Sequence, residues 1–390
     1  MQNNQRITVA FIGIFLSIVL LCEGYTLNNI YNTRDEIKVL YQNNGYSKEL
    51  FNGLDNLYRI NVAQKQKWIN LYGLLQKLMR RRIIGNFEFA KNDNGLMEII
   101  SMEESSLTED FANDLVYINK IAQEKEIKFI YIQMPSRNDL SIPKEFIITD
   151  TYYNNIRNIT DKFGVFCIKG DEILKESNLK LEDFYMRTDI HPTTEGEIVV
   201  ANKIKNVLQN NGIAINAIIS GPNDQNYELQ THKLLGNLAK SAGKYYNGVD
   251  VFNEYIPLND ANTKFEIKDL TTNTVIKNGV FSQSVMNSFQ DDVNSEPYWP
   301  YWVVDYLQYG KYAYNISNFT SDGPNIMFIC DSFCYRTISY LSLGCKNITV
   351  IDPRFAGGNE GVEEILNKND YDAIICLHGT QFLPFLNKSN

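Results

Sequence analysis

The feature of this sequence that most restricts its fold is a series of short apolar runs, separated by segments with helical periodicity. Amphipathic segments at 108–126 and 150–163 each end only a few residues before such a run. The runs that we expect as strands lie at 127–134, 165–168, 326–330, 348–351 and 373–377. Helix-then-strand units joined by short turns predict a parallel sheet with right-handed crossovers. The expected fold class is therefore α/β, and 390 residues allow one large domain or two moderate ones.

A long central segment breaks this pattern. From 211 to 321 the helix–strand rhythm stops, and Gly, Asn, Asp and Thr become frequent. Short alternating stretches typical of hairpins lie at 264–267, 274–276 and 280–282. We therefore expect an inserted, β-rich or irregular subdomain at 216–321, which divides the main domain into 85–215 and 322–390. An aromatic cluster at 298–302 within it either stacks on sugar rings or packs in the interior.

The N-terminal residues have the composition of a membrane segment. Residues 7–22 form an uncharged apolar run, preceded by Arg6 and followed by Glu23. With the next apolar residues the run approaches the roughly 20 residues that a membrane-spanning helix needs. The charge bias predicts a cytoplasmic N-terminus and an extracytoplasmic remainder. We expect a single-pass transmembrane anchor at 1–24 and a helical stalk at 25–84, with a cleaved signal peptide as the alternative.

Charge and cysteine usage exclude several kinds of partner. The net charge is −9 and the only compact basic run is three consecutive arginines, so we expect no nucleic-acid partner. No two cysteines have C-x-x-C spacing and no Gly-rich phosphate loop occurs, so we expect no metal site, dithiol redox pair or cofactor. Cys167, Cys330 and Cys376 lie in apolar runs and are interpreted as small buried side chains. A Cys334–Cys345 disulfide remains open.

Ser332 is the candidate nucleophile. It follows the strand expected at 326–330 and precedes a helical segment that begins at Tyr335. A strand that enters a helix through one tight turn places the turn residue at the carboxyl edge of the sheet, near helix-terminal N–H groups. The alternative is an ordinary helix start, because Asp and Ser are common N-cap residues.

Asp189 and His191 are the candidate partners of Ser332. They lie two residues apart, just ahead of a helix whose start is indicated by a capping box at 194–197. A neutral imidazole can accept the serine proton, and a carboxylate on the other ring nitrogen fixes its tautomer. His378, at the end of the last expected strand, competes for the role of base. A surface Asp and His beside a helix cap is the alternative without catalysis.

Three further residues are candidates for binding substrate or an oxyanion. Arg137 and Arg354 each follow an expected strand, at the sheet edge where ligands bind in α/β proteins. Either guanidinium could hold an acidic group or an oxyanion, or form a structural ion pair. Asp331, next to Ser332, is the third candidate.

Several of these segments together resemble a known family. They are DIHPTTEG at 189–196, CDSF at 330–333, PSR at 135–137, LGNL at 235–238 and DPR at 352–354. Taken in the order just given, they resemble five segments of the SGNH-like catalytic domain of the alginate O-acetyltransferase family. Those segments are D-x-H-W-T-x-x-G, G-D-S-F, P-x-K, GS-L and D-x-R. These proteins are called AlgJ/AlgX-like or DHHW proteins.

The resemblance implies a three-layer SGNH-like fold and an O-acyltransferase that acts outside the cytoplasm on a polysaccharide. It implies Ser332 as nucleophile, His191 as base, Asp189 as the group that orients the base, and Arg354 in the site. A membrane-embedded acyltransferase would supply the acetyl group. Two departures from the family motifs matter: proline stands where the family has tryptophan at 192, and cysteine stands where it has glycine at 330. The alternatives are a carbohydrate esterase with the same triad and a non-catalytic glycan-binding or assembly protein.

Overall fold

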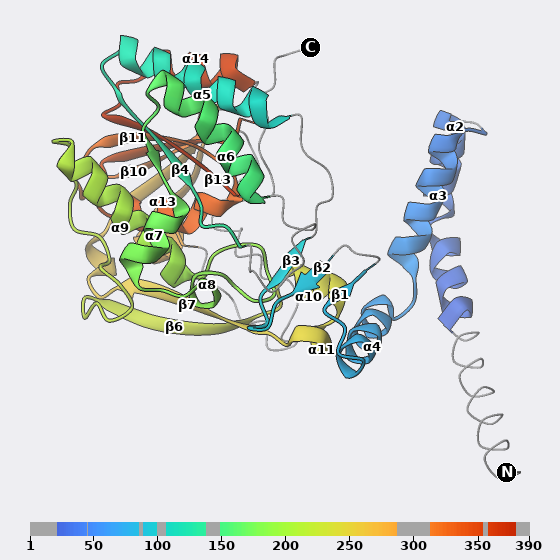
Figure 1. Cartoon of the computed structure of the whole chain (residues 1–390). Coiled ribbons are helices and arrows are strands. Elements are labelled where there is room, and N and C mark those ends of the chain that lie inside the picture. Colours follow the sequence, from blue (N-terminus) through green and yellow to red (C-terminus); the bar gives the residue numbers. More distant parts are fainter. Residues whose placement is uncertain are drawn as a thin grey trace, which may run out of the picture. The chain divides into compact units, whose positions relative to one another are not determined.

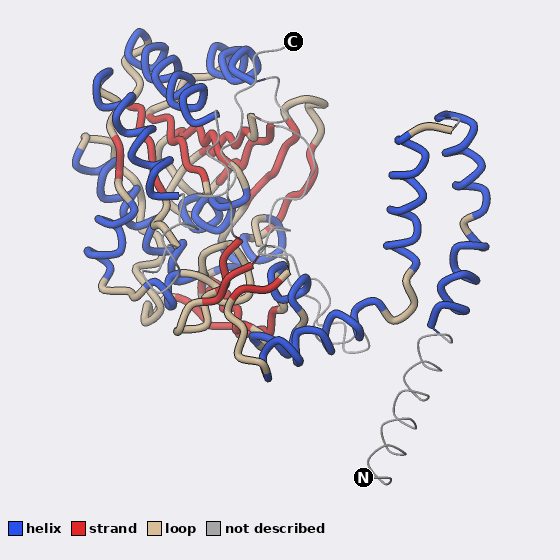
Figure 2. Tube along the Cα trace, turned by 45° about the vertical axis from the view of Figure 1, so that its right-hand side comes forward, coloured by secondary structure: helices blue, strands red, loops and turns tan. Residues whose placement is uncertain are grey.

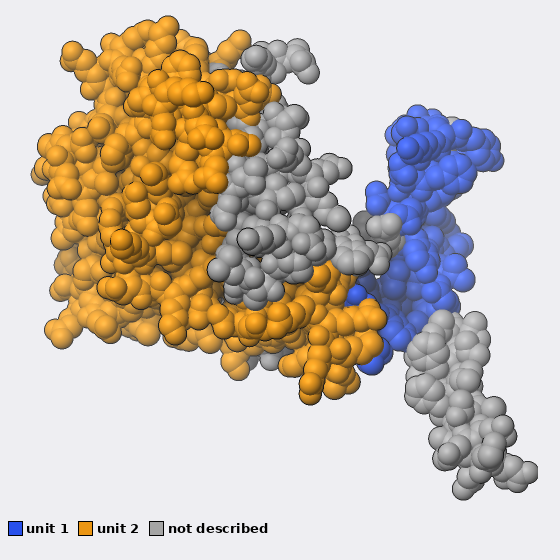
Figure 3. All heavy atoms as spheres, in the orientation of Figure 1, with its two compact units in different colours: residues 1–75 blue, residues 76–390 orange. Residues whose placement is uncertain are grey.

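The computed structural model describes seven stretches of the chain, residues 22–44, 46–85, 89–99, 107–137, 149–286, 313–353 and 358–379. The chain divides into two compact units, Met1–Leu75 and Gln76–Asn390 (Figure 3). Described helices at the N-terminal side are α2 (Arg34–Asn44), α3 (Lys48–Asn61) and α4 (Lys65–Leu78). Helices thus occupy much of the segment expected to be helical, and its role as a stalk stays a prediction.

The expected membrane anchor lies outside the described residues, except for its last few positions. Within the described stretches, no helix combines the length and apolar character needed to cross a membrane. The anchor at 1–24 therefore stays a prediction.

The second unit is built on one eight-stranded mixed sheet with the strand order β5-β4-β13-β11-β12-β10-β8-β9. Figure 1 labels four of these strands, β4, β13, β11 and β10. Five of these strands coincide with the expected apolar runs: β4 (Lys128–Gln133), β5 (Cys167–Ile168), β11 (Asn325–Cys330), β12 (Asn347–Ile351) and β13 (Ala373–His378). Each pairs in parallel with its neighbours among the five. The parallel α/β core that the sequence predicts is confirmed.

The other three strands correct the expectation of an all-parallel sheet. They are β8 (Phe265–Asp269), β9 (Val275–Gly279) and β10 (Ala313–Asn318). β10 pairs antiparallel with β12, β8 with β10, and β9 with β8. These strands come from the segment expected as a separate insertion, yet they extend the main sheet. They do so because inward-facing residues such as Phe265, Ile267 and Ile316 are buried and complete the same core.

Helices cover both faces of the sheet and make the three layers that were expected (Figures 1 and 2). On one face lie α5 (Leu107–Glu124), α6 (Thr149–Thr160) and α14 (Gly358–Lys368). On the other lie α7 (Gly170–Ser177), α9 (Thr194–Asn210) and α13 (Tyr335–Ser342). Successive side chains of each strand point to opposite faces, so β11 contributes Phe328 to one core and Ile329 to the other. Fully burying such a side chain contributes about 1.5–3 kcal/mol.

Smaller elements surround the sheet edge. A three-stranded antiparallel sheet consists of β1 (Ile83–Ile84), β2 (Phe89–Lys91) and β3 (Met97–Ile99). The strands β6 (Tyr227–Leu234) and β7 (Asp250–Pro257) form an antiparallel pair of their own. Short helices complete the unit: α8 (Leu181–Phe184), α10 (Asn237–Ala242), α11 (Lys244–Asn247) and α12 (Phe281–Ser284). The division of the main domain at 216 and 321 stays a prediction.

Candidate active site

Ser332 lies where the sequence predicts, in the turn after β11. It begins a short 3-10 helix, Ser332–Cys334, that continues into α13. Asp331 caps this turn, and its Oδ1 accepts the N–H of Phe333 at 3.0 Å. Ser332 is partly exposed while its neighbours Asp331 and Phe333 are buried, so the turn presents the serine at the surface of an otherwise closed core.

The structure brings Ser332, His191 and Asp189 together. Ser332 Oγ lies 2.9 Å from His191 Nε2, although the two residues are 141 positions apart in the chain. His191 Nδ1 lies 2.6 Å from Asp189 Oδ1. With Nδ1–H donating to the carboxylate, Nε2 is left as an acceptor for the serine hydroxyl. Phe333 packs against the His191 ring at a centroid distance of 4.9 Å.

The Asp189 carboxylate is held in its ionised form. Burial by itself would raise its pKa, but the His191 charge, the His191 hydrogen bond and two backbone N–H groups lower the pKa of Asp189 to about 2. Those backbone donors are His191 N–H, at 3.1 Å from Oδ1, and Asn237 N–H, at 2.8 Å from Oδ2. Asp189 therefore remains a charged acceptor for His191 at all physiological pH values.

Gly236 allows the segment that supplies this second donor to approach Asp189 closely. A Cβ atom at Gly236 would overlap the carbonyl group of Thr188, so no larger residue fits without displacing the loop. The Thr188 carbonyl in turn accepts the N–H of Leu238 at 3.0 Å. The Asn237 contact was not expected from sequence; only the LGNL motif pointed to this segment.

Arg137 does not lie at the surface of the site, which corrects its expected role in binding substrate or an oxyanion. Its side chain is buried, with Nε 3.0 Å from Glu98 Oε2. Nη1 donates to the carbonyls of Asp189 and Ile190 at 2.9 and 3.1 Å, and Nη2 contacts the carbonyls of Met97 and Met186. The guanidinium therefore fixes the backbone that carries Asp189 and His191.

Asp331 is likewise not a substrate-binding or oxyanion group. It is buried, and besides capping Phe333 its Oδ2 accepts the N–H of Gly379 at 3.0 Å, which ties the Ser332 turn to the end of β13. His378 Nδ1 lies 4.0 Å from the same carboxylate, and its ring packs against Phe111. His378 thus belongs to the structural side of the turn, and His191 is the imidazole that faces Ser332.

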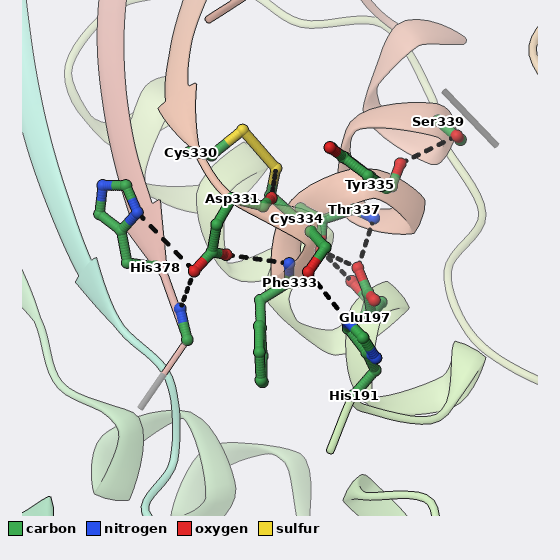
Figure 4. Close-up of a disulfide and its surroundings, with 12 residues drawn as sticks. His191, Glu197, Cys330, Asp331, Phe333, Cys334, Tyr335, Thr337, Ser339 and His378 are labelled. Atoms are coloured by element: carbon green, nitrogen blue, oxygen red, sulfur yellow. Dashed lines mark hydrogen bonds and ion pairs between the residues drawn. A yellow bond between two sulfur atoms is a disulfide. The ribbon is translucent and has the colours of Figure 1, made fainter. Parts of the chain in front are cut away.

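A disulfide between Cys330 and Cys334 encloses the turn (Figure 4). Cys330 is buried, as the sequence predicts, but the sequence analysis did not predict that it is paired. The open alternative of a Cys334–Cys345 bridge was wrong, because Cys345 is free and buried. Pairing at this spacing escaped the sequence analysis because cysteine positions alone do not determine connectivity.

The helix that follows His191 begins differently from the expected capping box. The N-cap is Thr193, whose Oγ1 accepts the N–H of Gly196 at 3.1 Å. Glu197 does not fold back on its own helix start but reaches Thr337 of α13, with Oε2 2.8 Å from the Thr337 N–H. Sequence reasoning therefore identified Glu197 but assigned it the wrong partner.

Two sequence-based candidates lie outside the described residues. These are Arg354 and the aromatic cluster at 298–302, and both stay predictions. Within the described stretches, no group of three or more His, Cys, Asp or Glu side chains is arranged to hold a metal ion.

Comparison with known proteins finds similarity in structure rather than in sequence. No protein-family model and no curated protein matches the sequence. Two solved structures of PatB1 from Bacillus cereus, one with a sulfonyl adduct, share 16% and 17% identity with this chain, with TM-scores of 0.56 and 0.58. They cover 76% of this chain, which covers 95% and 97% of theirs.

Two other solved structures carry the names of the family that the motifs resemble. A DHHW family protein from Eubacterium siraeum shares 16% identity over 76% of this chain and 91% of its own, with a TM-score of 0.49. The O-acetyltransferase domain of Pseudomonas putida AlgJ shares 10% identity over 78% of this chain and 93% of its own, with a TM-score of 0.42. These structures carry the names that the motifs predicted, and the shared fold itself is shown by the two PatB1 structures, whose TM-scores exceed 0.5.

Proposed function

We propose that this protein is a serine O-acetyltransferase that transfers acetyl groups to a cell-surface or exported polysaccharide through an acetyl-Ser332 intermediate. The observation that carries the proposal is the continuous hydrogen-bonded chain from Ser332 Oγ through His191 to Asp189, with distances of 2.9 and 2.6 Å. This geometry supports nucleophilic catalysis, because the base reaches the hydroxyl and is itself oriented by a carboxylate. The motif resemblance favours a sugar hydroxyl as the acceptor.

The reaction has two half reactions. In the first, His191 Nε2 takes the Ser332 proton while Oγ attacks the acetyl carbonyl carbon, and the same proton then passes to the leaving group of the donor. In the second, a sugar hydroxyl gives its proton to His191 and attacks the acetyl group, and Ser332 leaves with that proton. Asp189 stays ionised throughout and stabilises the imidazolium that forms in each half reaction.

The oxyanion of each tetrahedral intermediate needs hydrogen-bond donors. The first N–H groups of a helix have no acceptor within the helix, so the start of the turn after β11 supplies them. Within this turn, Asp331 accepts the N–H of Phe333 through its carboxylate and that of Cys334 through its carbonyl, so we assign the N–H of Ser332 as the oxyanion donor. Arg354 is the further candidate from the D-x-R motif.

The cellular setting is part of the proposal. The apolar run at 7–22 supports single-pass membrane anchoring with the catalytic unit on the extracytoplasmic side. The Cys330–Cys334 disulfide supports the same side, because disulfides persist in oxidising compartments. A membrane-embedded acyltransferase would then supply the acetyl donor.

The direct test is acetylation of the protein by an activated ester such as p-nitrophenyl acetate. We expect a mass increase of one acetyl group on Ser332, and Ser332→Ala should remove it. His191→Ala should slow acetylation by at least about 10³-fold. An acetyl adduct that persists in Ser332→Ala would rule out the assignment. A sulfonyl fluoride is a suitable second probe, since a sulfonyl adduct exists for PatB1.

A second experiment, with a sugar acceptor, distinguishes acetyl transfer from hydrolysis. Oligosaccharides added to the acetylated protein should gain acetyl groups faster than free acetate appears. If free acetate is the main product at every acceptor concentration, the protein is a carbohydrate esterase. If neither probe modifies the wild type, the non-catalytic alternative holds.

A further inference from the structure

We propose that Glu197 is a positioning residue for the acyl-transfer reaction. It would hold Ser332 and His191 at reacting distance by joining the helix behind one residue to the helix behind the other. This inference rests on the proposed function, because it assigns a role within the same site.

The contacts of Glu197 bridge two helices at the ends nearest to the reacting groups. Glu197 lies in the first turn of α9, which starts three residues after His191. Its Oε2 lies 2.8 Å from the N–H and 3.0 Å from the hydroxyl of Thr337. Thr337 is the third residue of α13, which follows the Ser332 turn without a break (Figure 4). A carboxylate at a helix N-terminus is also a favourable partner for the helix dipole.

The surroundings of Glu197 leave it little freedom to move. Its side chain is only 1% exposed, as is that of Arg336, whose Nε lies 3.8 Å from Glu197 Oε1. Arg336 Nη1 donates to Thr194 Oγ1 at 3.2 Å, and its guanidinium lies over the Phe252 ring. Burial raises the pKa of Glu197, while Arg336 and the Thr337 hydrogen bonds act in the opposite direction. Because no solvent competes for these contacts, the two helix ends are held in one arrangement.

A fixed arrangement matters because the reacting groups come from separate segments of the chain. The 2.9 Å contact between Ser332 Oγ and His191 Nε2 joins residues 141 positions apart. A misplacement of about 1 Å at a reacting group can cost about 10²-fold in rate. A contact that sets the relative position of α9 and α13 therefore acts on turnover rather than on substrate binding.

The experiment compares kcat and KM for p-nitrophenyl acetate in Glu197→Ala, Glu197→Gln and Glu195→Ala. The alanine variant at 197 loses the acceptor for Thr337, so kcat should fall about 30-fold while KM stays within about twofold. The glutamine variant keeps an oxygen acceptor, so its kcat should stay within about threefold of wild type.

Glu195→Ala is the matched control, because Glu195 is also on α9 but bonds elsewhere. Its Oε1 accepts from Asn253 Nδ2 and the Tyr255 hydroxyl, each at 2.7 Å, and reaches no part of α13. This variant should lose thermal stability and keep its kcat. Equal kcat values in Glu197→Ala and Glu195→Ala would overturn the positioning role and leave the proposed function intact. Equal losses of kcat in Glu197→Ala and Glu197→Gln would also overturn the positioning role.

The test does not depend on the folding of the alanine variant. Removing Glu197 leaves the buried Arg336 without its carboxylate, so Glu197→Ala can fail to fold. In that case Thr337→Val decides, because it removes the hydroxyl and keeps the N–H contact. It should lower kcat about three- to tenfold at unchanged KM, and a wild-type kcat would overturn the inference. A wild type that neither probe modifies would reject the proposed function and this inference together.

Discussion

The segment that carries Asp189 and His191 and the turn that carries Ser332 are held in place by different means. The loop at 185–193, which carries Asp189 and His191, is held by residues that are distant in sequence. Arg137 binds its carbonyls from about 50 positions away, and Asn237 binds Asp189 from 48 positions away. The turn at 330–334 is held mainly by itself, through the Cys330–Cys334 disulfide and the contact from Asp331 to Phe333.

This difference teaches where each half of the site is vulnerable. The loop depends on charged groups buried among carbonyls, so losing one of them removes several contacts at once. The turn depends mainly on covalent and short-range contacts, and the bond from Gly379 to Asp331 is a long-range contact that adds to them. We therefore expect substitutions behind the loop to have larger effects than substitutions within the turn, Ser332 itself excepted.

The largest expected effect is on the charge that orients the base. Asp189→Asn keeps the shape of the side chain but lets an amide face His191 Nδ1, which favours the wrong tautomer. The rate of Ser332 acetylation should fall by about 10³–10⁴-fold, while the protein still folds. Stopped-flow release of p-nitrophenolate measures this rate. A loss below tenfold would mean that the loop does not need Asp189 to orient His191.

The low pKa of Asp189 also predicts how the stability of the fold changes in acid. Its folded pKa of about 2 lies below the ordinary value of 3.8, so it stabilises the fold above about pH 4. That stabilisation, about 2 kcal/mol for a shift of this size, is lost as the pH falls toward 2. Unfolding free energies of wild type and Asp189→Asn should therefore converge between pH 4 and pH 2. A difference that stays constant over this range would contradict the assignment.

The next effect tests the anchor of the loop. Arg137→Met keeps much of the buried volume but removes the contacts to the loop carbonyls and the ion pair with Glu98. The unfolding free energy should fall by about 3–5 kcal/mol. Chemical denaturation measures the loss. As a control, Arg157→Met alters an arginine on α6 whose described bond is to Asn154, on the same helix, and should cost less than about 0.5 kcal/mol. Equal losses of unfolding free energy in Arg137→Met and Arg157→Met would contradict the role of Arg137 in anchoring the loop.

The smallest effect is expected in the turn. Replacing Cys330 and Cys334 together by alanine opens a closed loop of only a few residues, for which the chain-entropy contribution is about 2 kcal/mol. The acetylation rate should fall less than tenfold, because Asp331 still caps the turn and binds Gly379. Peptide mapping without reduction checks the bridge in the wild type. A loss of acetylation rate as large as that of Asp189→Asn would contradict our expectation that substitutions within the turn have the smaller effects.

The sequence predicted the parallel half of the sheet and the meeting of Ser332, His191 and Asp189, because both follow from local patterns. Strand runs and the ends of strands are readable from apolar periodicity, and the carboxyl ends of parallel strands share one edge. It did not predict that the strands at 265–318 join the main sheet. Alternating apolar residues indicate a half-buried strand but do not say which strand it pairs with.

The supporting contacts were predicted least well, for a related physical reason. A Thr-x-x-Glu pattern looks the same whether the carboxylate bonds its own helix or another, so Glu197 was assigned to a capping box. Arg137 was expected at the surface because it follows a strand. Its side chain is instead surrounded by backbone carbonyls from distant segments, and no local sequence pattern predicts these contacts. The carbonyls belong to Met97, Met186, Asp189 and Ile190.

The position of β13 has a consequence for how the chain matures on the ribosome. β13 is the last described strand along the chain but lies between β4 and β11 in the sheet. Until residues 373–378 have been synthesised, the earlier and later halves of the sheet present two unpaired strand edges with a gap between them. Gly379, whose N–H binds Asp331 in the Ser332 turn, is synthesised later still. The candidate active site is thus among the last features to be completed during translation. A chain that stalls before 373 exposes the unpaired edges of β4 and β11 to aggregation or chaperone binding.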